Sequence, residues 1–360
     1  SIFIIYLSNY GIKTERFNNL ILEKIKKYDS KLSVDINDVF LKLNVDEKTI
    51  KINTENAKLN FDNKFINIST IDINLDILKF LKKENSIKTI KIYTNKNKIN
   101  KITSFLNYYK FSIPRLIIYN QIEDGFVEAE INIKNVENSN TALIYSIKGI
   151  VSDGKLNLLN NSKIKDINFI FNIEDKKYAI KNVNFNYEKV DFSSEKILIE
   201  KLENNYEIKG ELANNLGFAD QNFISKIFNL KLDFLENKKI LISTKNKFKF
   251  KINSKNKIKD FNLNSKIDFK EIFINKNIQN LISLQNGTII SNFEKNNLSI
   301  DIDSGYSFLN DDYKNNEKDR INIKFFKKNN EDFKVVALIK NENNSINSIE
   351  LSKYIKNINK

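Results

Sequence analysis

The chain has 360 residues, of which 41% are hydrophobic and 29% charged, which is enough apolar material for a folded core. It contains no Cys and no His, which excludes disulfides, thiolate metal sites and the commonest general base. The formal net charge is +14, and nearly all basic residues are Lys, because Arg occurs only at positions 16, 115 and 320.

The chain opens with an apolar run, Ile2–Leu7, about a third of the roughly 20 residues that a helix needs to cross a bilayer. Two interpretations stay open: an ordinary first strand, or the tail of a membrane-anchor helix over residues 1–12. Tyr6 and Tyr10 suit the membrane interface, and Gly11 suits a helix exit. The second interpretation predicts a chain held in a membrane by its N-terminus.

Residues 13–110 are expected to form a helix followed by a meander of short strands. In Thr14–Tyr28 the apolar residues recur at helical spacing, and Thr14 is a suitable N-cap. After residue 30 the spacing changes to two, which is typical of half-buried strands separated by polar turns. Shorter helical patterns at Asp76–Lys83 and Lys98–Tyr109 interrupt the strands.

Residues 111–360 are expected to form a repetitive β region, interrupted by one helix at Asp220–Leu230. The sequence therefore predicts a mainly β fold: a long, twisted antiparallel meander curled into an open groove, with an N-terminal amphipathic helix and a few short helices. We expect the apolar residues of its clearest strands to line that groove, and these are Ile131, Ile133, Ile167, Phe169, Phe171, Ile173, Val183, Phe185, Ile197, Ile199, Ile208, Phe248 and Phe250.

A weak internal similarity connects three glycines of this region. Ile147-Lys-Gly-Ile-Val-Ser-Asp153 is similar to Ile208-Lys-Gly-Glu-Leu-Ala-Asn214, and the segment around Gly287 is a looser match. Each segment places a glycine in or beside a strand with a polar turn close by. Ser152-Asp153-Gly154 is accordingly expected to be a hairpin turn.

No catalytic signature accompanies the strands. The chain has no phosphate-binding glycine loop, no nucleophile elbow and no His for a triad or zinc site, so we expect no enzyme activity, no cofactor and no metal. Asp301 and Asp303 share one face of a strand and are conceivable cation ligands, but solvated outer-face residues are the simpler interpretation. The dispersed lysines likewise indicate a solvated face rather than a nucleic-acid partner, since clustered Arg is lacking.

The order of these elements resembles the N-terminal part of the AsmA-like proteins of the Gram-negative envelope, a group that includes TamB- and YhdP-type proteins. The shared order begins with an apolar helix tail (Ile2–Leu7) and an amphipathic helix (Arg16–Tyr28) that leads into a strand (Leu32–Ile36). Short strands and the element Ile71–Leu81 follow, and then a strand (Ile87–Ile92) and a further segment (Ile102–Leu106). The later strands, with Gly149 and Gly210, look like the family's long β region.

The resemblance implies a fragment of a longer protein with an inner-membrane anchor, a periplasmic body and a β-groove that carries phospholipid between membranes. Lys13 and Arg16 depart from this picture, because positive charge after a span favours the cytoplasmic side. From the residues alone, an alternating face must be buried somewhere, and few helices are present to cover it. Two functions stay open: a groove for phospholipid acyl chains, or a structural β-scaffold that binds other envelope proteins.

Overall fold

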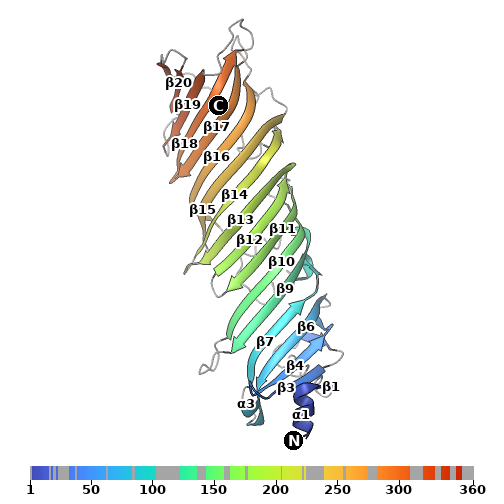
Figure 1. Ribbon diagram of the computed structural model, residues 1–360. Helices are drawn as coiled ribbons and strands as arrows, with labels where there is room; N and C mark the ends of the chain where they lie inside the picture. The colour runs from blue at the N-terminus through green and yellow to red at the C-terminus, as the bar shows by residue number, and fades with distance from the viewer. Residues whose placement is uncertain are drawn as a thin grey trace. The chain divides into compact units, whose positions relative to one another are not determined.

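The computed structural model describes residues 2–15, 18, 22, 32–36, 39–61, 64–82, 86–102, 122–135, 143–157, 163–174, 177–203, 205–220, 223, 239–253, 257–274, 282–308, 319–328, 334–340 and 346–350. Within them the chain is mainly antiparallel β-sheet with few short helices, as the sequence predicts (Figure 1). It divides into two compact units, Ser1–Ile180 and Lys181–Lys360. The border expected near residue 110 and the helix expected over Thr14–Tyr28 fall outside the described residues, apart from isolated positions.

Among the described residues, unit 1 begins with helix α1 and continues with strands and the short helix α3. The elements are α1 (Ile2–Asn9), β1 (Ile12–Thr14), β2 (Leu32–Asp35), β3 (Val39–Asn44), β4 (Thr49–Glu55), β5 (Lys58–Phe61), β6 (Lys64–Asp76), α3 (Ile77–Leu81), β7 (Ile87–Thr94), β8 (Asn97–Lys98), β9 (Ile122–Asn135), β10 (Leu143–Asn157) and β11 (Lys163–Glu174). Strand β12 (Lys177–Tyr187) crosses the division between the units.

The main sheet of unit 1 pairs its strands in the order β1, β3, β4, β6, β7, β9, β10, β11, all antiparallel. Strand β6 is long enough to serve two sheets. Its first part pairs with β5, which pairs in turn with β2, while its second part pairs with β4. Helix α1 packs against β3.

Unit 2 is a simpler meander in which each strand from β13 to β21 pairs antiparallel with the next. The strands are β13 (Val190–Lys201), β14 (Asn205–Asp220), β15 (Lys239–Asn253), β16 (Ile258–Ile274), β17 (Ile282–Glu294), β18 (Asn297–Phe308), β19 (Arg320–Lys327), β20 (Lys334–Lys340) and β21 (Ile346–Glu350). As far as its strands are described, the sheet is not closed.

Alternation of side chains along each strand explains why these segments become sheet. In β15, Phe248 and Phe250 are half-buried, whereas Lys247 and Lys249 between them are exposed, because successive residues point to opposite faces. The β17–β18 hairpin turns on Lys295 and Asn296, which both have positive φ (50° and 64°). Two such residues give a turn whose twist matches that of the strands.

The short helices agree with the sequence where they are described. Residues 2–9 form a helix, so the first-strand interpretation is wrong. The chain leaves α1 through Gly11, whose φ of 69° is easily adopted by glycine, as expected for a helix exit. Asp76 caps α3 by accepting a hydrogen bond from the Lys79 amide (3.1 Å), and residues 99–102 are helical.

The predicted hairpin turn at Ser152-Asp153-Gly154 is wrong. These residues lie within β10, where the pairing register with β9 and β11 shifts. Asp153 has a positive φ of 54°, and its amide donates to the Asn168 side chain (3.2 Å). A β-bulge uses the same left-handed residues as a tight turn, which is why the sequence signal was misassigned.

Candidate functional site

A row of isoleucines crosses the sheet of unit 1. Ile71, Ile92, Ile131, Ile147 and Ile173 come from β6, β7, β9, β10 and β11, and each lies directly opposite the next. Residues that face each other across an antiparallel pair share a face of the sheet. All five side chains are half-buried. The row is therefore a continuous, partly accessible apolar strip across five strands.

The predicted groove residues of unit 1 lie on this same face. Ile131 and Ile133 come from β9, and Ile167, Phe169, Phe171 and Ile173 alternate along β11. Strand β10 lies between them and connects the two groups, because its Ile147 opposes both Ile131 and Ile173. All six predicted side chains are half-buried.

Unit 2 has an equivalent apolar row. Ile267, Ile289, Ile302, Ile323 and Ala337 come from β16 to β20 and lie directly opposite one another in turn. Ala337 is buried and the four isoleucines are half-buried. The apolar face of each unit is thus produced by register across strands as well as by alternation along them.

Five predicted residues of unit 2 form two further rows of this face. Ile197 and Phe248 flank Gly210, and Ile199 and Phe250 flank Ile208, in the registers of β13, β14 and β15. The five apolar side chains of these rows, Ile197, Ile199, Ile208, Phe248 and Phe250, are half-buried. Sequence periodicity therefore selected residues that the fold brings together.

Aromatic rings continue this surface across β15, β16 and β17. The Phe250 ring lies 6.1 Å from both Phe248 and Phe261, and Phe261 lies 5.8 Å from Phe293, measured between centroids. All four rings are half-buried. They form a connected aromatic surface that stays partly open to solvent.

Part of this apolar face of unit 2 is closed by a buried core, and three isoleucines of the row pack against that core: Ile267, Ile289 and Ile302. Phe223, from the connection between β14 and β15, is only 4% exposed and packs against Phe192 (ring centroids 6.1 Å apart) and Tyr187 (6.0 Å). Its amide donates to the Asp220 side chain (2.8 Å), and Phe223 itself is helical; the rest of the segment predicted as a helix, up to Leu230, lies outside the described residues.

This closed part is a true core, centred on Phe192, Phe223, Ile242, Phe269 and Leu284. One predicted groove residue packs against this core: Phe185 stacks on Phe192 with centroids 5.4 Å apart. Another predicted groove residue, Val183, is buried, at 6% exposure, and so does not line an open surface. Burial, together with the nearby Asp319 carboxylate, raises the pKa of Tyr306 at the margin of this core.

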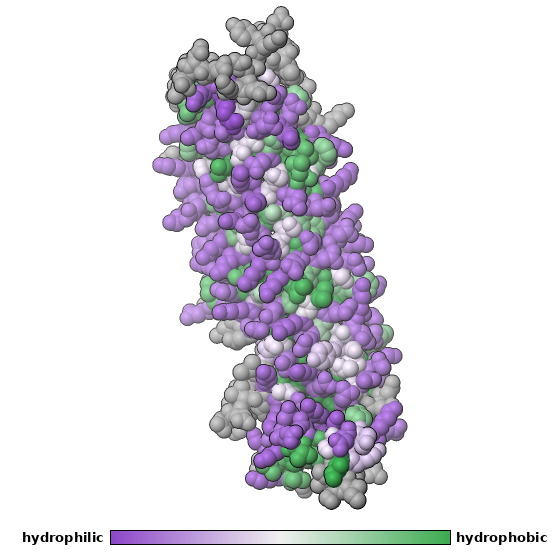
Figure 2. Space-filling model, viewed as in Figure 1, coloured by the Kyte–Doolittle hydropathy of each residue, from purple (hydrophilic) through white to green (hydrophobic). Residues whose placement is uncertain are grey.

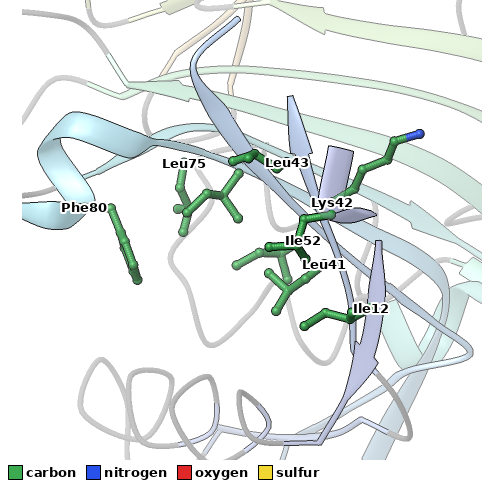
Figure 3. Close-up of a pocket in the computed structure, with 9 residues that line it drawn as sticks. Ile12, Leu41, Lys42, Leu43, Ile52, Leu75 and Phe80 are labelled. Atoms are coloured by element: carbon green, nitrogen blue, oxygen red, sulfur yellow. The ribbon is translucent and has the colours of Figure 1, made fainter. Parts of the chain in front are cut away.

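An apolar pocket of about 230 Å³ lies near the N-terminal end of unit 1. Its lining comes from α1, β1, β3, β4, β6 and α3, and consists of Leu7, Ile12, Leu41, Lys42, Leu43, Ile50, Ile52, Leu75 and Phe80. Figure 3 shows Phe80 facing the β-strand residues across this space, with Ile12 at the opposite side. The sequence analysis did not identify this pocket, because it depends on the approach of α1 and α3 to the same strands.

Polar residues also occupy the apolar face, which the sequence analysis missed. Thr244 and Ser265 are less than a tenth exposed, and Asn246 lies beside them on the same face. The Asn246 amide donates to the Thr244 hydroxyl (3.0 Å) and the Leu212 carbonyl (3.1 Å), and the Ser265 hydroxyl donates to the Asn246 carbonyl oxygen. Thr244 and Asn246 interrupt the hydrophobic alternation of β15, and this interruption could have indicated the polar cluster from the sequence.

The opposite face is hydrophilic, and its charges are paired across strands. Figure 2 shows mostly hydrophilic side chains over the strands in that view. Asp303 receives two hydrogen bonds from Arg320 (3.1 and 2.9 Å), and Asp301 lies 3.7 Å from the Lys324 ammonium. The two carboxylates considered as cation ligands therefore have basic partners from the neighbouring strand. The adjacent carboxylates Asp311 and Asp312, a second place where acidic residues come together in the sequence, lie outside the described residues.

No helix among the described residues has the length and apolar character to cross a bilayer. Those residues also contain no group of three or more side chains suited to hold a metal ion. No protein-family model, curated protein or solved structure matches the chain. The apolar faces of the two units are the features that indicate a function.

Proposed function

We propose that the apolar faces of the two units bind phospholipid acyl chains, and that the protein conducts lipid between the membranes of a cell envelope. The observation that carries the proposal is the pair of isoleucine rows, which cross successive strands and remain half-buried. Sheets whose faces are filled by a second layer bury such rows. The isoleucines of both rows keep part of their apolar surface accessible, and three of those in unit 2 also pack against the closed core.

Acyl chains match this surface chemically. A methylene chain lying along Ile and Phe side chains loses water on both partners, and each buried CH₂ contributes about 0.8 kcal/mol. No polar or catalytic group is required, so the proposal includes neither an enzyme activity nor a cofactor. The exposed lysines of the other face keep the sheet in solution while its apolar face carries the ligand.

The cellular setting belongs to the same proposal. Helix α1 and the AsmA-like order of elements support an inner-membrane anchor with a periplasmic body, acting in outer-membrane biogenesis and contacting other envelope proteins. The partners we propose are phospholipid acyl chains and the inner membrane, with no nucleic acid.

The proposal is tested by native mass spectrometry of the protein purified from membranes, which should show bound phospholipid. Phe250→Asp introduces a charge on the apolar face and should reduce the bound lipid while the fold survives, because Phe250 is only half-buried. Phe326→Asp is the matched control, since Phe326 is 45% exposed on the opposite face, between Ser299 and Lys334. Equal lipid content in both variants, or none in the parent protein, would refute the proposal.

A structural β-scaffold is the second candidate, and the closed core around Phe223 favours it. If apolar faces are generally covered as they are there, the sheet serves only to hold other envelope proteins. Phe250→Asp would then lower stability as a core substitution does, and the purified protein would carry no lipid. Circular dichroism of the two variants, measured beside the lipid content, separates the two functions.

A further inference from the structure

One end of unit 1 exposes large apolar side chains from three separate segments. Leu78 and Leu81 of α3 are 58% and 71% exposed, and Ile5 and Tyr6 of α1 are 58% and 50% exposed. Val45, in the turn between β3 and β4, is exposed as well. Single exposed apolar residues are ordinary on protein surfaces, but several at one end indicate an interaction surface.

The three segments are neighbours in the fold. The first amide of α3, on Ile77, donates to the carbonyl of Lys48 in the β3–β4 turn (3.1 Å). Leu7 of α1 and Phe80 of α3 line the same pocket. Figure 1 places both helices at the end of unit 1 that carries the N-terminus. The exposed side chains therefore belong to one surface.

Helix α3 has an unusual composition for its position. Its sequence is Ile-Leu-Lys-Phe-Leu, yet none of its residues is buried. The Asp76 cap and the bond to the β3–β4 turn fix the helix, so its exposed leucines are held outward by ordered structure. Phe80 lines the pocket, but Leu78 and Leu81 stay exposed, and another partner is needed to remove these two side chains from water.

The chemistry of the surface fits the boundary of a bilayer. Tyr6 and Tyr10 are both at least half exposed, with their rings 5.5 Å apart, and exposed tyrosines are typical of membrane interfaces. Lys79 and Lys82 flank the leucines of α3, whereas Asp46, Glu47 and Lys48 lie in the adjoining turn. Because the charges nearly balance, apolar insertion supplies most of the affinity and anionic lipid adds little.

We propose that this end of unit 1 is a membrane-interface surface into which Leu78 and Leu81 of α3 insert. Helix α3 thereby provides a second membrane contact beside α1. The inference does not depend on whether the sheets carry acyl chains, because it concerns a different surface.

The chain contains no Trp, so a single introduced Trp reports its own surroundings. Leu81→Trp, in the full chain mixed with phosphatidylcholine vesicles, should show a blue-shifted emission that brominated lipids quench. Leu216→Trp is the matched control, because Leu216 is 61% exposed on β14 of unit 2. Its emission should stay unchanged. A shift of equal size in both variants, or none at position 81, would overturn the inference.

A second measurement tests the contribution of α3 to affinity. Leu78→Ser combined with Leu81→Ser should lower vesicle partitioning by at least about tenfold, since two exposed leucines would lose their burial in the bilayer. Leu216→Ser should leave partitioning unchanged. Partitioning equal to that of the parent would show that α1 alone makes the contact, and would sink the inference whatever the lipid content of the sheets. Anionic phosphatidylglycerol should increase binding only slightly.

Discussion

Gly287 on β17 lies directly opposite Phe269 on β16, and the phenyl ring occupies the space where a side chain at position 287 would lie. Phe269 is only 4% exposed and belongs to the core of unit 2. The glycine therefore makes room for an aromatic ring across the strand, an arrangement that compensates for the weakness of glycine in a sheet.

Gly287→Ala should destabilise unit 2 by about 1–3 kcal/mol, because the new methyl group would overlap the Phe269 ring and crowd Ser304. Gly217→Ala is the control in the same unit. Its nearest neighbours would lie 3.5 Å or more from the new Cβ, so it should be neutral or slightly stabilising. Urea denaturation followed by circular dichroism measures both. Equal midpoints for the two variants would contradict the close-approach explanation.

The same pairing occurs at the other two glycines that the sequence analysis related to each other. Gly149 lies opposite Phe171, and Gly210 lies opposite Phe248. A few residues after each glycine, the register with the next strand shifts, between Val151 and Gly154 in β10 and between Asn214 and Gly217 in β14. The weak similarity therefore marks a structural device: a ring-covered glycine followed by a β-bulge.

Sequence reasoning identified these segments but assigned their polar residues to turns. Local residue type cannot separate a bulge from a hairpin turn, since both need left-handed residues; the choice depends on whether the chain continues to pair with the next strand. Strand identity was easier to predict. In β15 the alternation of Lys with Phe fixes both the strand and its apolar face.

What covers the apolar face could not be predicted from alternation. Phe223, in a predicted helix, and Phe250, in a predicted strand, both belong to apolar patterns, yet Phe223 is buried and Phe250 is half-buried. The difference arises because Phe223 packs against Phe192 and Tyr187, which come from segments earlier in the chain. Periodicity indicates which face of a strand is apolar, but it does not indicate which distant residues pack over that face.

Phe223→Ala should lower the free energy of unfolding by about 3–5 kcal/mol, the cost of deleting a buried aromatic side chain. Phe218→Ala is the matched comparison, because Phe218 is 60% exposed on β14 and should change stability by less than about 0.5 kcal/mol. Chemical denaturation of the two variants measures the difference. If Phe223→Ala were as mild as Phe218→Ala, Phe223 would not contribute to the core of unit 2 as its burial indicates.

Helix α3 should lose order in acid. The amide of Lys79, which donates to Asp76, and the nearby Lys88 ammonium (3.2 Å) hold the pKa of that carboxyl below its usual value of 3.8. A group whose folded pKa is lowered stabilises the fold at pH values above its unfolded pKa, and that contribution is lost as the pH falls through the folded value. The helical ¹³Cα shifts of residues 77–81 should therefore decrease at pH values below 3.8.

Asp76→Asn separates this effect from general acid unfolding. The Asn side chain still accepts the Lys79 amide but does not titrate, so the helical shifts of this variant should depend much less on pH in that range. Asp76→Ala removes the acceptor and should weaken α3 at every pH. An identical pH response in the parent and in Asp76→Asn would show that Asp76 is not responsible.

The hydrophilic face of the sheet, which carries exposed lysines, should not bind nucleic acid strongly, despite the net charge of +14. Several lysines on β15 already face carboxylates of adjacent strands: Lys249 lies 3.1 Å from Glu207, Lys251 lies 2.9 Å from Asp260, and Lys247 lies 3.7 Å from Glu211. Phosphate binding by lysine releases counterions, so a genuine nucleic-acid surface loses affinity steeply as salt rises. Carboxylates interspersed among the lysines repel a phosphate backbone and reduce the affinity gained from counterion release.

Filter binding with single-stranded and duplex DNA over a salt series should show weak retention, with an affinity that depends only slightly on the salt concentration. Tight binding with a steep salt dependence, abolished by Lys249→Glu, would instead make this face a nucleic-acid surface.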